Sequence, residues 1–254
     1  MKILAITTGD PAGIGPEITV KALQFHPLHP EIAYVVYGRY PDYKQGHPII
    51  EINDIKEVRK PGLYHIQIDE DSIHPGFPSF ESGKTALEIL QRVTIDLNAG
   101  KVQAVLTAPV SKTWIRHTDP HFIGHTEFFA KQSNVDEVIM SFWGPVFNIS
   151  LLTTHMAIAE VRDNLSPEIV KNKIRLIVQE TRKQIPDARF AMLGLNPHAG
   201  EEGAFGIEDI MIKDTLETLS REEKIEVDGP FPADTFFHSK YTKYQMIISA
   251  YHDQ

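Results

Sequence analysis

Short apolar runs that alternate with helical patterns are the feature that most constrains the fold of this chain. The clearest helical pattern covers residues 82–98, where Leu87, Leu90 and Leu97 recur at helical spacing before Gly100 ends it. Strands that alternate with helices predict an α/β fold with a parallel or mostly parallel sheet. The other predicted helices are 167–184 and 207–219, and the predicted strands are 3–7, 33–37, 104–107, 147–153, 189–195 and 246–251.

Composition limits the classes of function. The 254 residues are 42% hydrophobic, which suffices for one large or two small domains. A formal charge of −9 argues against a general nucleic-acid binder. We find no run of about 20 apolar residues that would span a membrane and no secretory cleavage site, so we expect a cytoplasmic protein. Without cysteine, metal binding would depend on carboxylates and on the 12 histidines.

Polar residues follow five of the predicted strands. Ligands of open parallel sheets bind beyond the carboxyl ends of the strands, so we expect these five segments to face one cleft. Pro and Gly cluster at 26–48 and 74–83, which we interpret as surface loops or a small appended hairpin. The segments that follow strands contain Gly9-Asp10-Pro11, Thr107-Ala108-Pro109, His155, His198 and His252.

The three histidines of this set suggest a metal site. Imidazole binds zinc and similar ions and leaves positions open for substrate oxygens. Each histidine taken alone has a plainer interpretation, since a histidine at a strand end often only bonds to backbone. The spacing contains no compact HExxH pattern, so the shared position after a strand carries the hypothesis.

The first strand runs into TTGDPAGIGPE, which invites comparison with the dinucleotide-binding turn GxGxxG. The fingerprint fails because Ile18 stands at the third glycine position and Pro16 intervenes. A tight turn with Pro16 at the first helical position fits better, and its free N–H groups could face an anion. A purely structural turn remains the alternative.

Five further polar residues are candidates. In GHTE, Thr126 could cap a helix whose start, together with His125, attracts a phosphate group; a simple cap with a surface histidine is the alternative. Lys112 could bind phosphate or carboxylate, or be solvated surface. Asp234 and Asp253 could orient water or a ligand, although Asp also serves in ordinary turns.

The motifs together resemble one family closely, that of 4-hydroxythreonine-4-phosphate dehydrogenase, which acts in vitamin B6 biosynthesis. A branch that oxidises D-threonate or D-erythronate 4-phosphate is similar in most of these motifs. The resemblance spans the chain and is carried by TTGDPAGIGPEI, LTAPVSK, GHTEFFA, LLTTH, LNPHAGEEGAFG, GPFPADT and YHDQ, in that order.

This resemblance implies an α/β/α fold similar to that of isocitrate and isopropylmalate dehydrogenases, with two subdomains around a cleft, not a GxGxxG Rossmann domain. It implies a homodimer that completes each active site. We expect residues 1–112 and 240–254 to form the first subdomain, whose C-terminal part would be missing. Residues 113–239 would form the second subdomain, with the dimer contact and the metal site.

The resemblance also implies the site residues. His155, His198 and His252 would bind a divalent metal (Zn, Mg, Co, Mn or Ni), with ligands from both chains of the dimer. His125 and Thr126 would contact the substrate, a small phosphorylated hydroxy acid. The candidate proton acceptors are Asp253, Lys112 and Asp234, and no residue is assigned to the cofactor.

The implied reaction oxidises 4-phosphohydroxy-L-threonine with NAD or NADP. The metal would act as a Lewis acid, and the 3-oxo acid would lose carbon dioxide to give 3-amino-2-oxopropyl phosphate. No nucleic acid or membrane partner is implied.

Family chains continue past YHDQ into a stretch that supplies a Lys, an Asn and an Arg, so we expect the 254-residue polypeptide by itself to turn over poorly. A hydrolase with the same metal and phosphate site is an alternative from another class. A metal-stabilised binding module without activity is a third.

Overall fold

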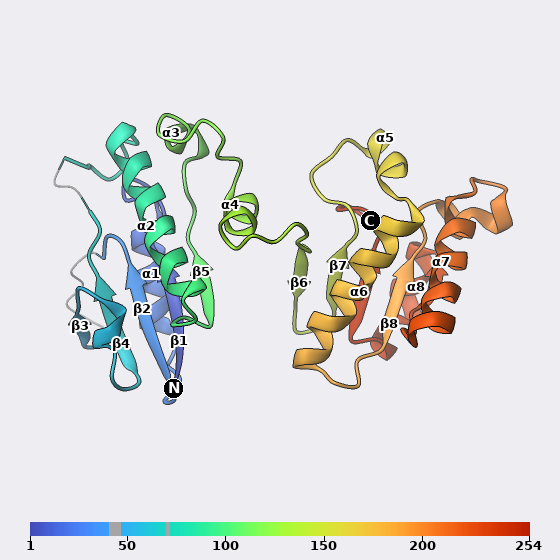
Figure 1. Ribbon diagram of the computed structural model, residues 1–254, viewed down its shortest axis with the longest axis horizontal. Helices are drawn as coiled ribbons and strands as arrows, with labels where there is room; N and C mark the ends of the chain where they lie inside the picture. The colour runs from blue at the N-terminus through green and yellow to red at the C-terminus, as the bar shows by residue number, and fades with distance from the viewer. Residues whose placement is uncertain (41–46, 70–71) are drawn as a thin grey trace. The chain divides into compact units, whose positions relative to one another are not determined.

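The computed structural model describes residues 1–40, 47–69 and 72–254, which form two compact units, Met1–Asp136 and Glu137–Gln254 (Figure 1). Residues 41–46, part of the predicted loop 26–48, lie outside the described residues. Each unit is an α/β structure, which confirms the predicted fold class. Among the described residues, no helix has the length and apolar character that crossing a membrane requires.

The first unit contains a parallel sheet. Its described strands have the order β3-β4-β2-β1-β5, and every pair is parallel. The strands are β1 (Lys2–Thr7), β2 (Ile32–Tyr37), β3 (Ile49–Glu51), β4 (Gly62–Ile66) and β5 (Ala104–Thr107). The helices are α1 (Gly15–Phe25), the short η1 (Ile55–Glu57), α2 (Phe80–Asn98), α3 (Lys112–Ile115) and α4 (His125–Gln132).

Helices cover both faces of this sheet, which explains why its central strands are almost continuously apolar. Val35 of β2 packs in the core that contains Ile89 of α2. Its neighbour Val36 points to the opposite face, into a core that contains Leu23 of α1. Because successive side chains alternate between faces, a strand that is covered on both sides needs an apolar residue at each position.

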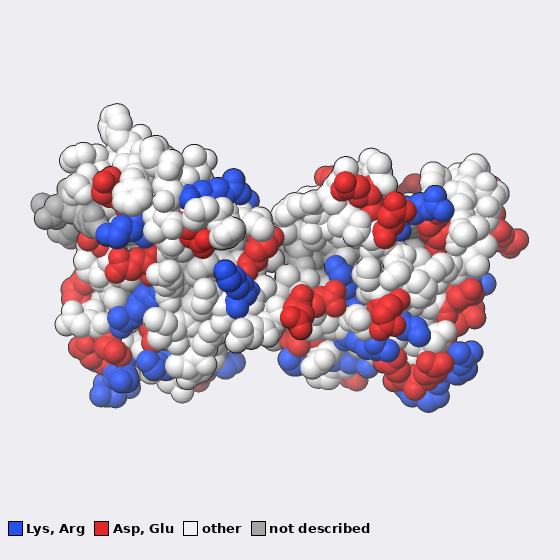
Figure 2. Space-filling model, turned by 45° about the horizontal axis from the view of Figure 1, so that its top comes forward, with Lys and Arg blue, Asp and Glu red and all other residues white. Residues whose placement is uncertain are grey.

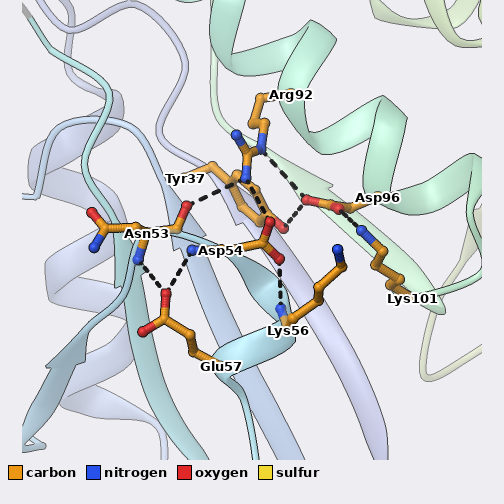
Figure 3. A network of polar contacts seen from close by, with 8 residues as sticks. All are labelled: Tyr37, Asn53, Asp54, Lys56, Glu57, Arg92, Asp96 and Lys101. Carbon is orange, nitrogen blue, oxygen red and sulfur yellow. Dashed lines mark hydrogen bonds and ion pairs between the residues drawn. The ribbon is translucent and has the colours of Figure 1, made fainter.

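A polar network joins α2 to the sheet (Figure 3). The buried Asp96 of α2 accepts a hydrogen bond of 3.0 Å from the Tyr37 hydroxyl at the end of β2. Lys101 donates to the same carboxylate at 2.9 Å, and Arg92 lies 3.8 Å from it. The carboxylate is therefore buried with partners of opposite charge.

The second unit contains a mixed sheet. Its described strands have the order β6-β7-β10-β8-β9; β6 is antiparallel to β7, and the other pairs are parallel. The strands are β6 (Ser141–Trp143), β7 (Asn148–Leu151), β8 (Phe190–Leu193), β9 (Asp228–Phe231) and β10 (Met246–Ser249). The helices are α5 (Ile158–Val161), the short η2 (Arg162–Asn164), α6 (Pro167–Gln184), α7 (Glu208–Glu223), α8 (Ala233–Ser239) and the short η4 (Tyr241–Lys243).

This second sheet is also covered on both faces. Ile248 of β10 lies in the core formed with α6 and α7, whereas Ile247 packs against Phe236 of α8. Helix α6 begins and ends where the sequence predicts. Ser166 caps its start and Pro167 occupies its first turn. The predicted helix at 207–219 exists as α7, which continues to Glu223.

The division of the chain differs from the one we expected. Residues 240–254 do not join the first unit, because β10 pairs with β7 on one side and with β8 on the other. The boundary lies after Asp136 and not after residue 112. Residues 113–136 stay with the first unit because Ile115, Phe122 and Phe128 pack against α2.

The surface carries charges of both signs. On the face drawn in Figure 2, acidic and basic side chains are interspersed over each unit. That face presents no broad field of one sign, so an anionic ligand there would have to be bound by particular side chains.

Candidate functional site

The three histidines singled out above lie at one edge of the second sheet. His155 follows β7, His252 follows β10 and His198 follows β8. These three strands are parallel neighbours with β10 in the middle, so their carboxyl ends and the segments after them share that edge. All three imidazoles are exposed in the chain.

His155 and His252 lie side by side. Their ring centres are 5.8 Å apart. Two imidazoles that bind one zinc ion at about 2.0–2.1 Å place their ring centres about 5–6 Å apart, so the observed spacing suits a shared ion. The segments that carry them are tied together, since Thr153 donates its N–H (3.2 Å) and its hydroxyl (2.7 Å) to the carbonyl of Ala250.

His198 is presented by a strained loop. The loop Pro197–Gly203 is left-handed at His198 (φ 54°), Ala199 (φ 51°) and three residues after them. Such a backbone costs about 1–2 kcal/mol for each residue that carries a Cβ. Strain of this kind collects at functional sites, where neighbouring contacts hold it in place.

Asp234 lies near His198, and both line a pocket of about 290 Å³ in the second unit. Gln254 lines the same pocket and donates a hydrogen bond from its amide to the carbonyl of Gly194. Asp253 is 92% exposed, and its carboxylate lies 3.4 Å from Nδ1 of His252. A carboxylate in this position can orient an imidazole that binds a metal through its other nitrogen.

The described residues of one chain do not form a complete metal site. Among the described residues, no three His, Asp or Glu side chains gather closely enough to hold an ion. His155 and His252 form a close pair, whereas His198 stands at the neighbouring strand end.

The other two of the five segments that follow predicted strands lie in the first unit. Gly9-Asp10 follows β1 and Thr107-Ala108-Pro109 follows β5, and these two strands are neighbours. The N–H of Asp10 donates to the carbonyl of Pro109 at 3.0 Å, and Asp10 is buried. The chain builds two sheets, with two of the segments on the first and three on the second.

The glycine-rich turn after β1 has a packing explanation. Helix α1 begins at Gly15 with Pro16 in its first turn, as predicted. A Cβ on Gly15 would collide with the carbonyl of Thr8, so the close approach of helix and strand requires glycine there.

Lys112, at the start of α3, lies near His125, at the start of α4. A Cβ added to Gly124 would lie 3.5 Å from Nζ of Lys112 and 3.1 Å from a carboxylate oxygen of Glu127. The Nε2 atom of His125 is buried without a hydrogen-bond partner. The pKa of His125 lies below its ordinary value, because burial disfavours the charged ring and because Lys112 lies nearby.

The predicted cap of α4 is wrong. Gly124 occupies the capping position, its backbone is extended, and Thr126 lies inside the first turn. Thr126 is exposed, so its hydroxyl is accessible at the start of the helix.

Two residues beside the histidines were not predicted from the sequence. Asp209 is buried against the His198 loop, and Phe142 of β6 packs edge-on against the His252 ring with 6.2 Å between ring centres. Asp209 follows Glu208 at the start of a helix, where acidic residues are common, so the sequence carried no signal of its contacts.

Comparisons with known proteins agree with this architecture. The family model described as "Pyridoxal phosphate biosynthetic protein PdxA" matches residues 32–254. The 4-hydroxythreonine-4-phosphate dehydrogenase of Sulfurihydrogenibium sp. is 34% identical over 261 residues, a match that covers 99% of this chain and 80% of that protein. The D-threonate 4-phosphate dehydrogenase of Pectobacterium atrosepticum is also 34% identical and is covered to 82% of its length.

Solved structures give the same result. The crystal structure of 4-hydroxythreonine-4-phosphate dehydrogenase from Klebsiella pneumoniae matches with a TM-score of 0.85 at 29% identity. That match covers 99% of this chain and 80% of the other. The chain is therefore a member of the family described as pyridoxal phosphate biosynthetic protein PdxA.

Proposed function

We propose that this protein is an NAD-dependent, divalent-metal-assisted dehydrogenase that oxidises and decarboxylates 4-phosphohydroxy-L-threonine. The observation that carries the proposal is the placement of His155, His198 and His252 after three neighbouring parallel strands. It is supported by family membership and by relatives named for this activity.

The three histidines would hold the metal. The spacing of the His155 and His252 rings suits a shared ion, and imidazole nitrogens suit Zn, Co, Ni or Mn. When bound, the ion supplies a Lewis acid for the hydroxyl that is oxidised and for the charge that develops during decarboxylation. NAD or NADP would supply the hydride acceptor.

Lys112, His125 and Thr126 would bind the substrate, with its phosphate at the start of α4. Helix N–H groups and the Lys112 ammonium favour an anion there, and the unpartnered Nε2 of His125 can donate to it. Phosphate at this point would favour the charged form of His125 and so raise its pKa.

Asp253 is the first choice for the group that accepts the hydroxyl proton, because it is exposed beside His252. Lys112 and Asp234 are the other two candidates. Of these, Asp234 shares a pocket with His198 and Lys112 lies in the other unit.

We further propose the isocitrate and isopropylmalate dehydrogenase type of α/β/α fold, without a GxGxxG cofactor turn, and a homodimer. The dimer is supported by apolar side chains on and after β6, where Phe142, Trp143 and Val146 are 48%, 51% and 66% exposed. Such a surface is typical of a contact with another chain. Because Phe142 also touches His252, a partner bound at β6 would lie next to the histidines.

A second candidate substrate is D-threonate 4-phosphate, or D-erythronate 4-phosphate. It is supported by the Pectobacterium relative, whose 34% identity equals that of the Sulfurihydrogenibium relative. The two candidates share the phosphate and the oxidised hydroxyl, and they differ in the group next to the carboxylate.

The test is a substrate panel. The protein with a defined divalent ion is mixed with each of the three phosphorylated acids and with NAD or NADP, and reduced cofactor and carbon dioxide are measured. We expect the highest kcat/KM with 4-phosphohydroxy-L-threonine. Faster oxidation of a threonate or erythronate phosphate would select the second candidate, and release of inorganic phosphate without cofactor reduction would indicate a hydrolase.

Metal binding gives a readout that does not depend on turnover. We expect His198→Ala to weaken Co²⁺ binding, measured by calorimetry, by at least about tenfold. His238→Ala is the matched control, because His238 is an exposed histidine of the same unit on α8. Equal Co²⁺ affinity in both variants would contradict the metal site.

A further inference from the structure

The backbone that presents His198 is held by an acidic pair at the start of α7, Glu208 and Asp209. Asp209 is 2% exposed. Its Oδ1 accepts the N–H of Leu195 at 2.7 Å, and its Oδ2 accepts the N–H and the side-chain amide of Asn196 at 3.0 and 2.9 Å. One carboxylate therefore fixes the two residues that lead into Pro197 and His198.

The fit around Asp209 leaves little room for another arrangement. A Cβ on Gly194 would lie 2.7 Å from Oδ1, and a Cβ on Gly200 would lie 3.0 Å from Oδ2. The carboxylate is thus enclosed by residues that precede and follow His198 in the chain. Its charge is balanced by N–H donors and by the start of α7, where negative charge is favourable.

Glu208 extends these contacts to the chain that follows His155. Its Oε2 accepts the Asn196 side-chain amide at 3.0 Å, and its Oε1 pairs with Nε of Arg162 at 2.6 Å. Arg162 begins η2, which comes directly after α5 and seven residues after His155. An ion pair and hydrogen bonds therefore join the segments after β7 and β8.

We propose that Glu208 and Asp209 are positioning residues that hold the left-handed loop in the one conformation that directs His198 to the metal. This inference rests on the proposed metal site. Both carboxylates would act through the residues that they contact, namely the backbone and side chain of Asn196 and the backbone of Leu195. Preorganisation of a ligand by hydrogen-bonded carboxylates commonly changes metal affinity by about 10- to 100-fold.

The test compares Co²⁺ binding by the wild-type protein, Asp209→Asn and Asp214→Asn. In Asp209→Asn an amide nitrogen would face a backbone N–H, so at least one hydrogen bond is lost. Asp214 is exposed on the same helix, so Asp214→Asn makes the same chemical change without touching the loop. We expect Asp209→Asn to weaken Co²⁺ binding about 10- to 100-fold and to change the absorption spectrum of bound Co²⁺. That spectrum reports ligand geometry, which a uniform loss of stability does not alter.

Glu208→Gln and His198→Ala distinguish a failure of the positioning role from a failure of the metal site. Glu208→Gln removes only the ion pair with Arg162, and we expect the same changes with smaller amplitude. If Asp209→Asn does not fold, unchanged Co²⁺ affinity and spectrum in Glu208→Gln would overturn the inference. If His198→Ala weakens binding and Asp209→Asn does not, positioning by Asp209 is overturned and the metal site stands. If His198→Ala binds Co²⁺ like the wild type, the metal site itself is overturned.

Discussion

The structure shifts the pKa of His125, one of the residues proposed to bind phosphate. Burial and the nearby Lys112 lower the pKa of His125. Its imidazole is therefore neutral over a wider part of the physiological pH range than that of an ordinary histidine. A neutral imidazole can gain a proton when an anion arrives, which suits a residue proposed to bind phosphate.

Lys112→Met is predicted to raise the pKa of His125. Removal of the neighbouring positive charge makes the charged imidazole less unfavourable, while burial continues to act in the opposite direction. NMR titration of the His125 ring measures the shift. Lys131→Met, near the other end of α4, is the control and should leave the titration unchanged. Identical shifts in both variants would show that Lys112 has no particular effect.

Tyr37 gives a prediction at alkaline pH. Burial, and then the Asp96 carboxylate, raise the pKa of Tyr37 above its value in the unfolded chain. The folded state therefore binds the hydroxyl proton of Tyr37 more tightly than the unfolded chain does. The stability that this difference contributes is fully present below about pH 10 and is lost as the pH rises above that value.

Tyr37→Phe is accordingly predicted to lose less stability than the wild type between neutral pH and about pH 11. At neutral pH the variant should be about 1 kcal/mol less stable, because Asp96 loses a buried donor. Urea unfolding at the two pH values measures both effects. Tyr34→Phe, on the same strand but in the core on the opposite face, is the control. Parallel pH profiles for Tyr37→Phe and the wild type would contradict the prediction.

At the scale of elements, helix α2 is stabilised by a pair of side-chain hydrogen bonds at its N-terminus. The hydroxyl of Ser79 accepts the N–H of Ser82 at 3.3 Å, and the hydroxyl of Ser82 accepts the N–H of Ser79 at 3.0 Å. Each bond satisfies a donor that has no partner within the helix. The same helix supplies Asp96 and Arg92 to the polar network that joins α2 to the sheet. The position at which the helix begins therefore affects contacts elsewhere in the first unit.

Ser79→Ala is predicted to lower the free energy of unfolding by about 1 kcal/mol, the usual loss for a helix cap. Chemical denaturation followed by circular dichroism provides the measurement. Ser239→Ala, at the exposed end of α8, is the control and should change stability by less than about 0.5 kcal/mol. A Ser79→Ala variant as stable as this control would show that the cap contributes nothing measurable.

The long elements could be predicted from sequence, and several short ones could not. Helices α2 and α6 have a sustained apolar period and a capping serine, so local residues suffice to place them. Strand β6 has three residues and β9 contains Gly-Pro, and neither has a pattern of its own. Such strands form because a neighbouring strand offers hydrogen bonds, which is a tertiary effect.

At the scale of the whole molecule, the apolar surface at β6 leads to a prediction about assembly. Phe142, Trp143 and Val146 are exposed together, and the His252 ring adjoins them. A second chain that covers this surface would bury apolar area and would approach the proposed metal ligands at the same time.

Trp143→Arg is predicted to weaken a homodimer by at least about tenfold, because a charge would be buried against an apolar contact. Sedimentation velocity over a range of protein concentrations measures the equilibrium. Phe25→Arg changes an aromatic residue that is 80% exposed in the first unit, and it should leave the dimer intact. A monomeric wild-type protein, or equal dimerisation of both variants, would rule out this surface as the dimer contact.

The sequence by itself determined the α/β class, the long helices, the family motifs and the position of each candidate histidine after a strand, because these depend on local period and on residue type. Only the tertiary structure decided which strands are neighbours. It placed β10 between β7 and β8, which brings His155 beside His252, and it assigned the Gly9-Asp10 turn and the histidines to two different sheets. It also showed that Asp209 holds the His198 loop. Strand pairing and buried hydrogen bonds join residues that are far apart in the chain, and no local pattern records them.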